Sequence, residues 1–392
     1  IPSDYTDSKG ADRGCACHSS DPTGGRVGAE RGWPPSARIP QAIRVEVDTL
    51  DGWTSGDAKP TGTQFLRMVE VLKRPRALFF LPRAPAAASL PANFRHPPGE
   101  DRDVSAGAGR LIRQARRVQA AVSWARRDKA RLDLPRATVD SAPETTAETV
   151  LRWLAVTPSD RVAWRSPMDT YRGWRAALES RGVLVFELPI GNGDVRGFSA
   201  WDDHAPLIVT NLTSVSPAAR TFTLAHELGH LVTRQDSACL DPDGVNPFAV
   251  EIERWCEAFA GAFLMPRDEV RSLARERGIG DLAADLEDVK ALMSRFGVSA
   301  RASALRLIDL GYAPRTLYGI VLDVFRAVPR TNDPSRRISS PPRHEVRIKQ
   351  YGLGTVETVL SSLPQRDALS VMRLTVKDVR QMPEGMTGGQ SF

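Results

Sequence analysis

Long apolar runs are absent from this chain of 392 residues. No stretch approaches the roughly 20 consecutive apolar residues of a membrane helix, which excludes a membrane-spanning segment of that kind. The first residues, IPSDYTDSKGADRG, also lack the basic segment and apolar run of a secretory signal. Cysteine is scarce, with four in the whole chain, and scattered thiols favour a reducing compartment. We therefore expect a cytoplasmic protein that does not enter a membrane.

Neither the cysteines nor the charge balance defines a function. Cys15, Cys17 and His18 have the wrong spacing for a zinc knuckle, and no second cysteine pair follows to complete one. The formal net charge of +6 is mildly basic. Such a balance permits contact with nucleic acid without requiring it, because many soluble proteins share it.

Two parts of the N-terminal third lack the pattern of a compact domain. Residues 1–41 are rich in glycine, proline, serine and charge, and we expect them to be disordered or poorly packed. Residues 83–144 are expected to be a linker that contains a basic helix over 110–131. That helix has eight Arg and Lys residues against one Asp. It is either a solvated helix face or a surface that contacts phosphates.

Residues 42–82 contain a recognisable pattern. The run VDTLDGWTSG predicts a short helix that ends at its last glycine, and a second helix, TQFLRMVEVLK, follows the next proline and threonine. These helices resemble the second half of a Cro-repressor-like (XRE family) helix-turn-helix, and the matching residues are Trp53, Gly56, Pro60 and Thr61. The sequence upstream, GGRVGAERGWPPSARIP, is broken by proline and glycine, so we expect a truncated module. DNA contact through this region is one hypothesis.

From about residue 145 the pattern changes to mixed helix and strand. Helical spacing around 150–154 and 171–178 is followed by two apolar runs of strand type, GVLVFELP and PLIVTN, with GNGD and RGFSAW between them. The segment TFTLAHELGHLV comes directly afterwards and suits a buried helix. This order predicts an α+β domain with a small sheet beside the last helix.

That helix carries a pattern typical of a metal site. His226 and His230 are four residues apart, so their imidazoles project from one helix face, about one turn from each other. Both rings can then reach one tetrahedral Zn²⁺ at about 2.0–2.1 Å. Glu227 points to the side, where it can take a proton from a zinc-bound water and return it to a leaving amine.

A second helix supplies the candidate for a third ligand. In VEIERWCEAFAGAFLMPRDEV, Glu253 follows the second histidine after enough chain for a loop and a returning helix. Glu257 is one turn further on the same face, where it could accept a hydrogen bond from a ligating histidine. The alternative is a core helix with two chance histidines. Two carboxylates on one apolar helix face argue against it, because buried carboxylates need a cation or donors.

These two segments resemble the ImmA/IrrE family of zinc metallopeptidase domains. In that family an Ala-His-Glu-x-Gly-His helix is followed by a Glu-x-x-x-Asn/Asp helix that ends in Leu-Met-Pro, as FTLAHELGHL and IERWCEAFAGAFLMP do here. The resemblance covers residues 145–270 and implies a zincin-like fold in which Glu227 is the general base. It implies three zinc ligands: His226, His230 and Glu253. Glu257 departs from the family's Asn or Asp.

Two helical regions follow the peptidase segment. In residues 271–314 two helices flank FGVS, with Ser299 placed to cap the second, which is a helix-turn-helix-like arrangement. This unit either packs against the peptidase domain or reads DNA, for which Arg301 and Arg306 are the suitable side chains of its second helix. Residues 315–392 are expected to be a helical C-terminal region with a flexible tail.

The resemblance implies a zinc-dependent endopeptidase that cleaves a protein partner, a helix-turn-helix repressor, and so regulates transcription. The strand PLIVTN is expected to be a sheet edge that aligns an extended substrate. One alternative is a DNA-binding XRE-type regulator whose peptidase fold is a sensor or structural domain, and another is an inactive fold that binds a partner. His204 lies near the metal helix in sequence, but a lone loop histidine is more often a bystander than an oxyanion-stabilising group.

Overall fold

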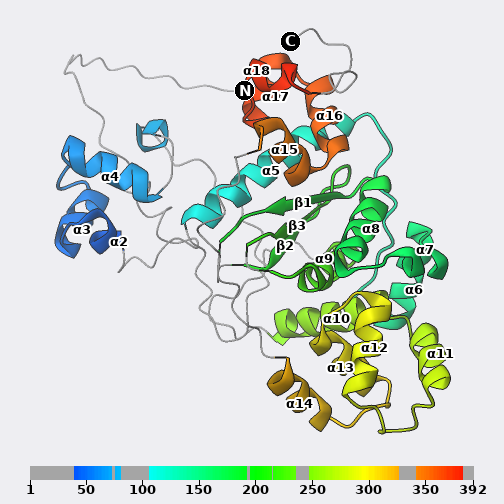
Figure 1. Ribbon diagram of the computed structural model, residues 1–392. Coiled ribbons are helices and arrows are strands. Elements are labelled where there is room, and N and C mark those ends of the chain that lie inside the picture. Colours follow the sequence, from blue (N-terminus) through cyan, green and yellow to red (C-terminus); the bar gives the residue numbers. More distant parts are fainter. Residues whose placement is uncertain are drawn as a thin grey trace, which may run out of the picture. The chain divides into compact units, whose positions relative to one another are not determined.

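The structure is a computed structural model, shown in Figure 1. It describes residues 39–72, 76–80, 106–191, 195–213, 215–234, 247–325 and 341–382. Most of the N-terminal stretch expected to be disordered, and the C-terminal tail, lie outside the described residues. The chain divides into two compact units, residues 1–88 and residues 89–392.

The first unit is helical in its described part, with α2 (Ile39–Ile43), α3 (Val47–Ser55), α4 (Gly62–Leu72) and the short 3-10 helix η2 (Arg76–Phe80). The two helices predicted here are confirmed. α3 ends at Gly56, whose φ of 90° lies in the left-handed region that glycine adopts readily. Before α4, the backbone N–H of Thr61 donates to the side chain of Gln64 at 2.8 Å.

The second unit contains a small sheet with helices on both faces. Its strands are β1 (Leu184–Leu188), β2 (Gly197–Ala200) and β3 (Leu207–Asn211). Its helices are α5 (Ala106–Arg126), α6 (Pro143–Leu154), α7 (Pro158–Ala163), α8 (Pro167–Ser180), α9 (Pro217–Thr233), α10 (Pro247–Leu264), α11 (Arg267–Arg277), α12 (Leu286–Phe296), α13 (Ala300–Asp309), α14 (Thr316–Val324), α15 (Arg343–Tyr351), α16 (Leu353–Ser362), α17 (Gln365–Met372) and α18 (Val376–Arg380). The predicted α+β class is confirmed. Among the described residues, no helix is both long and apolar enough to span a bilayer.

The strand order corrects one expectation. The sheet has the order β1-β3-β2, in which β3 pairs with β1 in parallel and with β2 in antiparallel register. β3, the strand PLIVTN, is therefore central, and the prediction that it forms a sheet edge is wrong. The strand after β2, which is β3, inserts between β1 and β2, and so β2 lies at an edge of this sheet.

Alternate side chains of the strands enter two separate cores. Val185 and Ile208 belong to the core that includes α8, α9 and α10, whereas Phe186 and Val209 belong to the core that includes α5, α16 and α17. Figure 1 shows these two groups of helices on opposite faces of the sheet. A strand that is buried on both faces has no polar side to alternate with, which explains its continuous apolar run.

The basic helix is part of the folded unit rather than of a linker. α5 buries Ile112 and Val118 in the core on one face of the sheet. The side-chain amide of Gln119 donates to the carbonyls of Ala200 and Ala205 at 3.0 and 2.9 Å, which ties the helix to β2 and the turn after it. Not all of its charges face solvent: Arg117 is exposed, whereas Arg126 donates to the carbonyl of Gly182 at 2.8 Å.

The helix pair after the peptidase segment has the predicted form. α12 ends at Gly297 with a φ of 64°, and the Ser299 hydroxyl accepts from the N–H of Ala302 to cap α13. Arg306 of α13 is buried and donates to both carboxylate oxygens of Glu144, at 2.5 and 3.0 Å, and to the carbonyl of Met265. The unit thus packs against α6 and the end of α10, and Arg306 does not reach out towards DNA.

Candidate metal centre

The helix that carries the two histidines is well defined by its ends. The Ser216 hydroxyl caps α9 by accepting from the N–H of Ala219, and a proline occupies the first helical position, where no N–H is needed. At the other end Arg234 adopts a left-handed conformation that stops the helix. Between these ends His226 and His230 lie on the buried face, one turn apart.

A glycine lets the second helix approach closely. A Cβ added at Gly229 would lie 3.1 Å from the Sγ of Cys256 and 3.2 Å from the ring of Phe259, so α9 and α10 touch at this point without a side chain between them. This close contact brings the half-exposed Glu253 of α10 against the two histidines.

The three candidate ligands meet at one position. The Nε2 atoms of His226 and His230 are 3.2 Å apart, and each lies beside a different oxygen of Glu253, at 3.1 and 3.3 Å. A tetrahedral ion with bonds of about 2.0–2.1 Å separates its ligands by roughly 3.3–3.4 Å. The observed separations are close to this value, and the donor set of two imidazoles and a carboxylate suits zinc, so these residues fit a metal ion.

The electrostatics of Glu253 suit a group that stays ionised. Burial raises the pKa of its carboxyl, but the hydrogen bonds and charges of His226 and His230 outweigh that effect and hold the pKa well below its usual range. The carboxylate is therefore available as an anionic ligand at any physiological pH.

Glu227 lies beside the sheet rather than among the three ligand atoms. It is fully buried, and its Cγ is 3.7 Å from the position that a Cβ at Gly197 would take. That same Cβ would lie 2.4 Å from the Thr223 side chain and 2.7 Å from the carbonyl of Val209, so only glycine fits at the start of β2. The carboxylate of Glu227 is thus held between the metal centre and the edge strand.

Two residues singled out from the sequence do not join the centre. Glu257 is exposed, and the residue that hydrogen-bonds His230 is instead Cys256, which is buried and whose pKa is raised mainly by that burial. Cys256 is three residues after Glu253, so helical spacing allowed it as well as Glu257. His204 lies in the turn after β2, where its backbone contacts Asp202 and Arg126.

A triad of charged residues connects α9, the helix of the two histidines, to the sheet. Glu187 of β1 is buried between two arginines: its carboxylate accepts from Arg175 of α8 at 2.6 Å and from Arg220 of α9. Sequence reasoning missed this triad because its members lie on three different elements. Its contact with α9 is at Arg220, six residues before the first histidine of that helix.

Replacing Glu187 by glutamine should lower the free energy of unfolding by roughly 3–5 kcal/mol, because the buried Arg220 would lose its counter-charge and Arg175 would lose one of its two. Urea denaturation would measure the change. Glu179 is more exposed, and its ion pair among the described residues is with Arg175, so it provides the control: its replacement by glutamine should cost less than about 1 kcal/mol. Equal effects of the two substitutions would contradict the importance of the triad.

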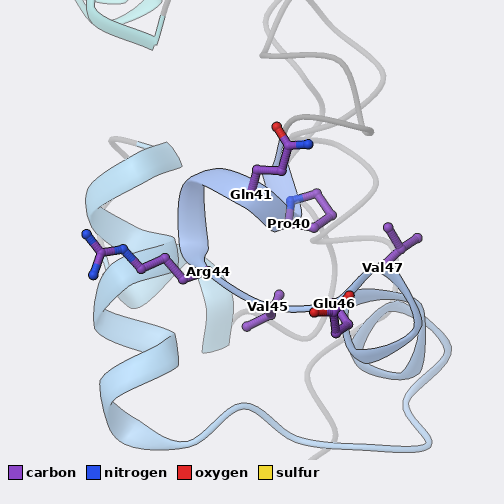
Figure 2. Close-up of a pocket in the computed structure, with 6 residues that line it drawn as sticks. All are labelled: Pro40, Gln41, Arg44, Val45, Glu46 and Val47. Carbon is purple, nitrogen blue, oxygen red and sulfur yellow. The ribbon is translucent and has the colours of Figure 1, made fainter.

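A hollow of about 490 Å³ in the first unit offers no comparable chemistry. Figure 2 shows that the side chains of Gln41, Arg44 and Glu46, which line it, point in different directions. Their polar groups do not converge on one ligand position. The two hypotheses of DNA contact, through residues 42–82 and through α5, stay predictions.

Comparison with known proteins identifies the domain around the metal centre. Residues 178–307 match the family described as the IrrE N-terminal-like domain (Peptidase_M78), a span that runs from the end of α8 to α13. Among solved structures, a Mycobacterium tuberculosis transcriptional regulator is similar to 49% of this chain, over 51% of its own length, with 19% identity and a TM-score of 0.30. The chain therefore spans about half of that structure. No curated protein matches the sequence. The segment around the candidate ligands, residues 178–307, is thus similar to the M78 peptidase domain family.

Proposed function

We propose that this chain is a zinc-dependent endopeptidase of the ImmA/IrrE type. The observation that carries the proposal is the meeting of His226, His230 and Glu253 within about one tetrahedral edge of each other, in a domain of a peptidase family. Three protein ligands leave a fourth position for water or substrate, which is the arrangement of catalytic rather than structural zinc. Zinc bound there would supply a Lewis acid that polarises the scissile carbonyl and acidifies a water molecule.

Glu227 supplies the proton transfers in this proposal. A buried carboxylate beside the ligand cluster is placed to accept a proton from the attacking water and to deliver it to the leaving amine. The sequential position next to His226 turns its side chain away from the shared ligand position, so it acts on water rather than as a ligand.

The edge strand β2 is the proposed guide for an extended substrate. The N–H of Asn211 donates to the carbonyl of Arg196 at 2.9 Å, so these two residues form a hydrogen-bonded pair of the antiparallel ladder. Hydrogen-bonded and non-hydrogen-bonded pairs alternate along an antiparallel ladder. Gly197 with Thr210 and Ser199 with Ile208 are therefore non-hydrogen-bonded pairs. The backbone groups of Gly197 and Ser199 therefore point away from β3, towards the side from which a peptide strand would pair with β2. Both residues are buried in the free protein, so the substrate would have to displace what covers them.

Replacing Ser199 by proline should lower the rate of peptide cleavage at least tenfold, because proline removes an N–H that faces the substrate and not β3. Zinc content, measured in the same preparation, should stay unchanged. Ser199→Ala, which keeps the N–H, is the matched control and should cleave at close to the wild-type rate. A folded Ser199→Pro variant with undiminished cleavage would show that the substrate does not pair with β2.

The proposed substrate is a helix-turn-helix repressor, whose cleavage would relieve repression. The family domain supports a peptidase, and a mildly basic chain with helix-turn-helix-like segments is compatible with a role in transcription. The direct test is to incubate the zinc-loaded protein with the repressor encoded beside its gene and to analyse the products by mass spectrometry. A chelator-sensitive cut at one bond is expected. An intact repressor, together with a zinc-bound enzyme that cleaves no protein offered, would favour a sensor domain instead.

A further inference from the structure

A groove of about 670 Å³ lies on the second unit, away from the metal centre. It is formed where α8, α9 and α13 begin and where α12 ends. Ser216, at the start of α9, lines the groove and precedes His226 by ten residues, which is about 15 Å along a helix. The groove is therefore a separate site from the ligand cluster, although one helix runs from one to the other.

The lining of the groove carries positive charge. Four basic residues contribute to it, and no carboxylate is among its lining residues, within the part of the chain that the structure describes. One of the four, Lys290, also pairs at 2.6 Å with Glu287, which does not line the groove. The four are Arg165, Arg196, Lys290 and Arg301. They come from four separate segments of the chain, so no single helix accounts for the charge.

The backbone adds to this positive potential. α8, α9 and α13 have 14, 17 and 10 residues, and their capping residues Ser166, Ser216 and Ser299 all line the groove. The first N–H groups of a helix have no partner within the helix, and its N-terminal end carries a partial positive charge. The C-terminal end of α12 carries the opposite partial charge, and Asp169 lies in the first turn of α8, so both offset part of this potential. The remaining helix ends and the arginines of the groove favour an anion such as a phosphate.

Apolar side chains line the same groove. Trp164, Met293 and Phe325 contribute to it, and its volume is in the range of about 300–1,000 Å³ that small-molecule sites occupy. A bare inorganic anion would leave these apolar surfaces unused. The combination suits a ligand with phosphates at one end and an aromatic or apolar body at the other.

We propose that this groove binds a small phosphorylated molecule of the nucleotide class. Such a ligand would contact α8 and α9 on one side and α12 and α13 on the other, and so would hold the helical unit 271–314 against the peptidase fold. Because it binds only the folded protein, it should raise the unfolding temperature. This site does not depend on the proposed peptidase activity, since its test measures binding alone.

The experiment compares three probes by titration calorimetry at physiological salt: ATP, inorganic pyrophosphate and adenosine. ATP should bind most tightly, pyrophosphate more weakly, and adenosine at least tenfold more weakly than ATP, since charge-assisted hydrogen bonds are the stronger kind. The double substitution Arg165→Ala with Arg301→Ala should weaken ATP binding at least tenfold. Both arginines are exposed, so the unliganded variant should keep its unfolding temperature.

Arg275→Ala is the matched control, because Arg275 is an exposed arginine of α11 that does not line the groove. It should leave ATP binding unchanged. The proposal is overturned if neither ATP nor pyrophosphate binds, or if the control weakens binding as much as the double substitution does. It is equally overturned if a short single-stranded oligonucleotide binds far more tightly than ATP, since the groove would then be part of a nucleic-acid surface.

Discussion

Replacing Glu253 by alanine should lower the affinity for zinc by more than about 100-fold. Loss of a residue that only hydrogen-bonds a metal ligand already costs roughly 10–100-fold, and Glu253 is proposed as a ligand itself. Two imidazoles would remain, and they cannot hold a tetrahedral ion with the same strength. Purified Glu253→Ala protein should therefore contain almost no zinc after dialysis, whereas the wild type should retain about one ion per chain. Elemental analysis by mass spectrometry measures this directly.

Glu257→Ala is the control for that experiment. Glu257 lies on the same helix, four residues further on, but its side chain is exposed and does not reach the histidines. Its removal should leave the zinc content unchanged. The side chain of Glu253 is itself 45% exposed, so its loss should not unfold the protein. If Glu253→Ala retains zinc with wild-type affinity, the ion is bound elsewhere and the three residues are not its ligands.

The meeting of the candidate ligands could be predicted in part, because two of the three are placed by local helical spacing. The placing of His226 and His230 on one face follows from helical spacing alone. Glu253 required a tertiary contact, and the sequence pointed to it through the apolar face of its helix and through resemblance to a known family. The structure brings these three residues together as expected.

The choice between neighbours on α10 could not be made from spacing. Cys256 and Glu257 are three and four residues after Glu253, and both positions lie near the same face of a helix. The rotation of α10 about its axis decides which one meets His230. That rotation is set by the close contact at Gly229, where Cys256 packs, and such a contact is not visible in a pattern of polar and apolar residues.

The order of the strands and the packing of α5 against the sheet could not be predicted from the sequence either. The run PLIVTN is apolar whether the strand is central or at an edge, so its position depends on how the chain returns after β2. In the helix predicted over 110–131, the eight basic residues drew attention away from a stripe of buried residues of α5 at helical spacing: Ala108, Ile112, Ala115, Val118 and Val122. Arg306 and Glu144 are 162 residues apart, and no local signal connects them.

The substitution Glu227→Gln separates binding from catalysis. Glutamine has the size of glutamate and can fill the same buried space beside Gly197, but it cannot take up a proton at neutral pH. We expect cleavage of the protein substrate to fall by roughly 10²–10⁴-fold, the usual contribution of a general acid–base group. Zinc content should be that of the wild type, because Glu227 is not among the three clustered ligand atoms.

The pair of variants Glu227→Gln and Glu253→Ala then distinguishes the rival functions. A peptidase loses cleavage in both, with zinc retained only in the first. A sensor or partner-binding domain that needs only the metal should be impaired by Glu253→Ala and unaffected by Glu227→Gln, whether the readout is repression or partner binding. Full activity of Glu227→Gln in a cleavage assay would mean that a group other than this buried carboxylate moves the proton.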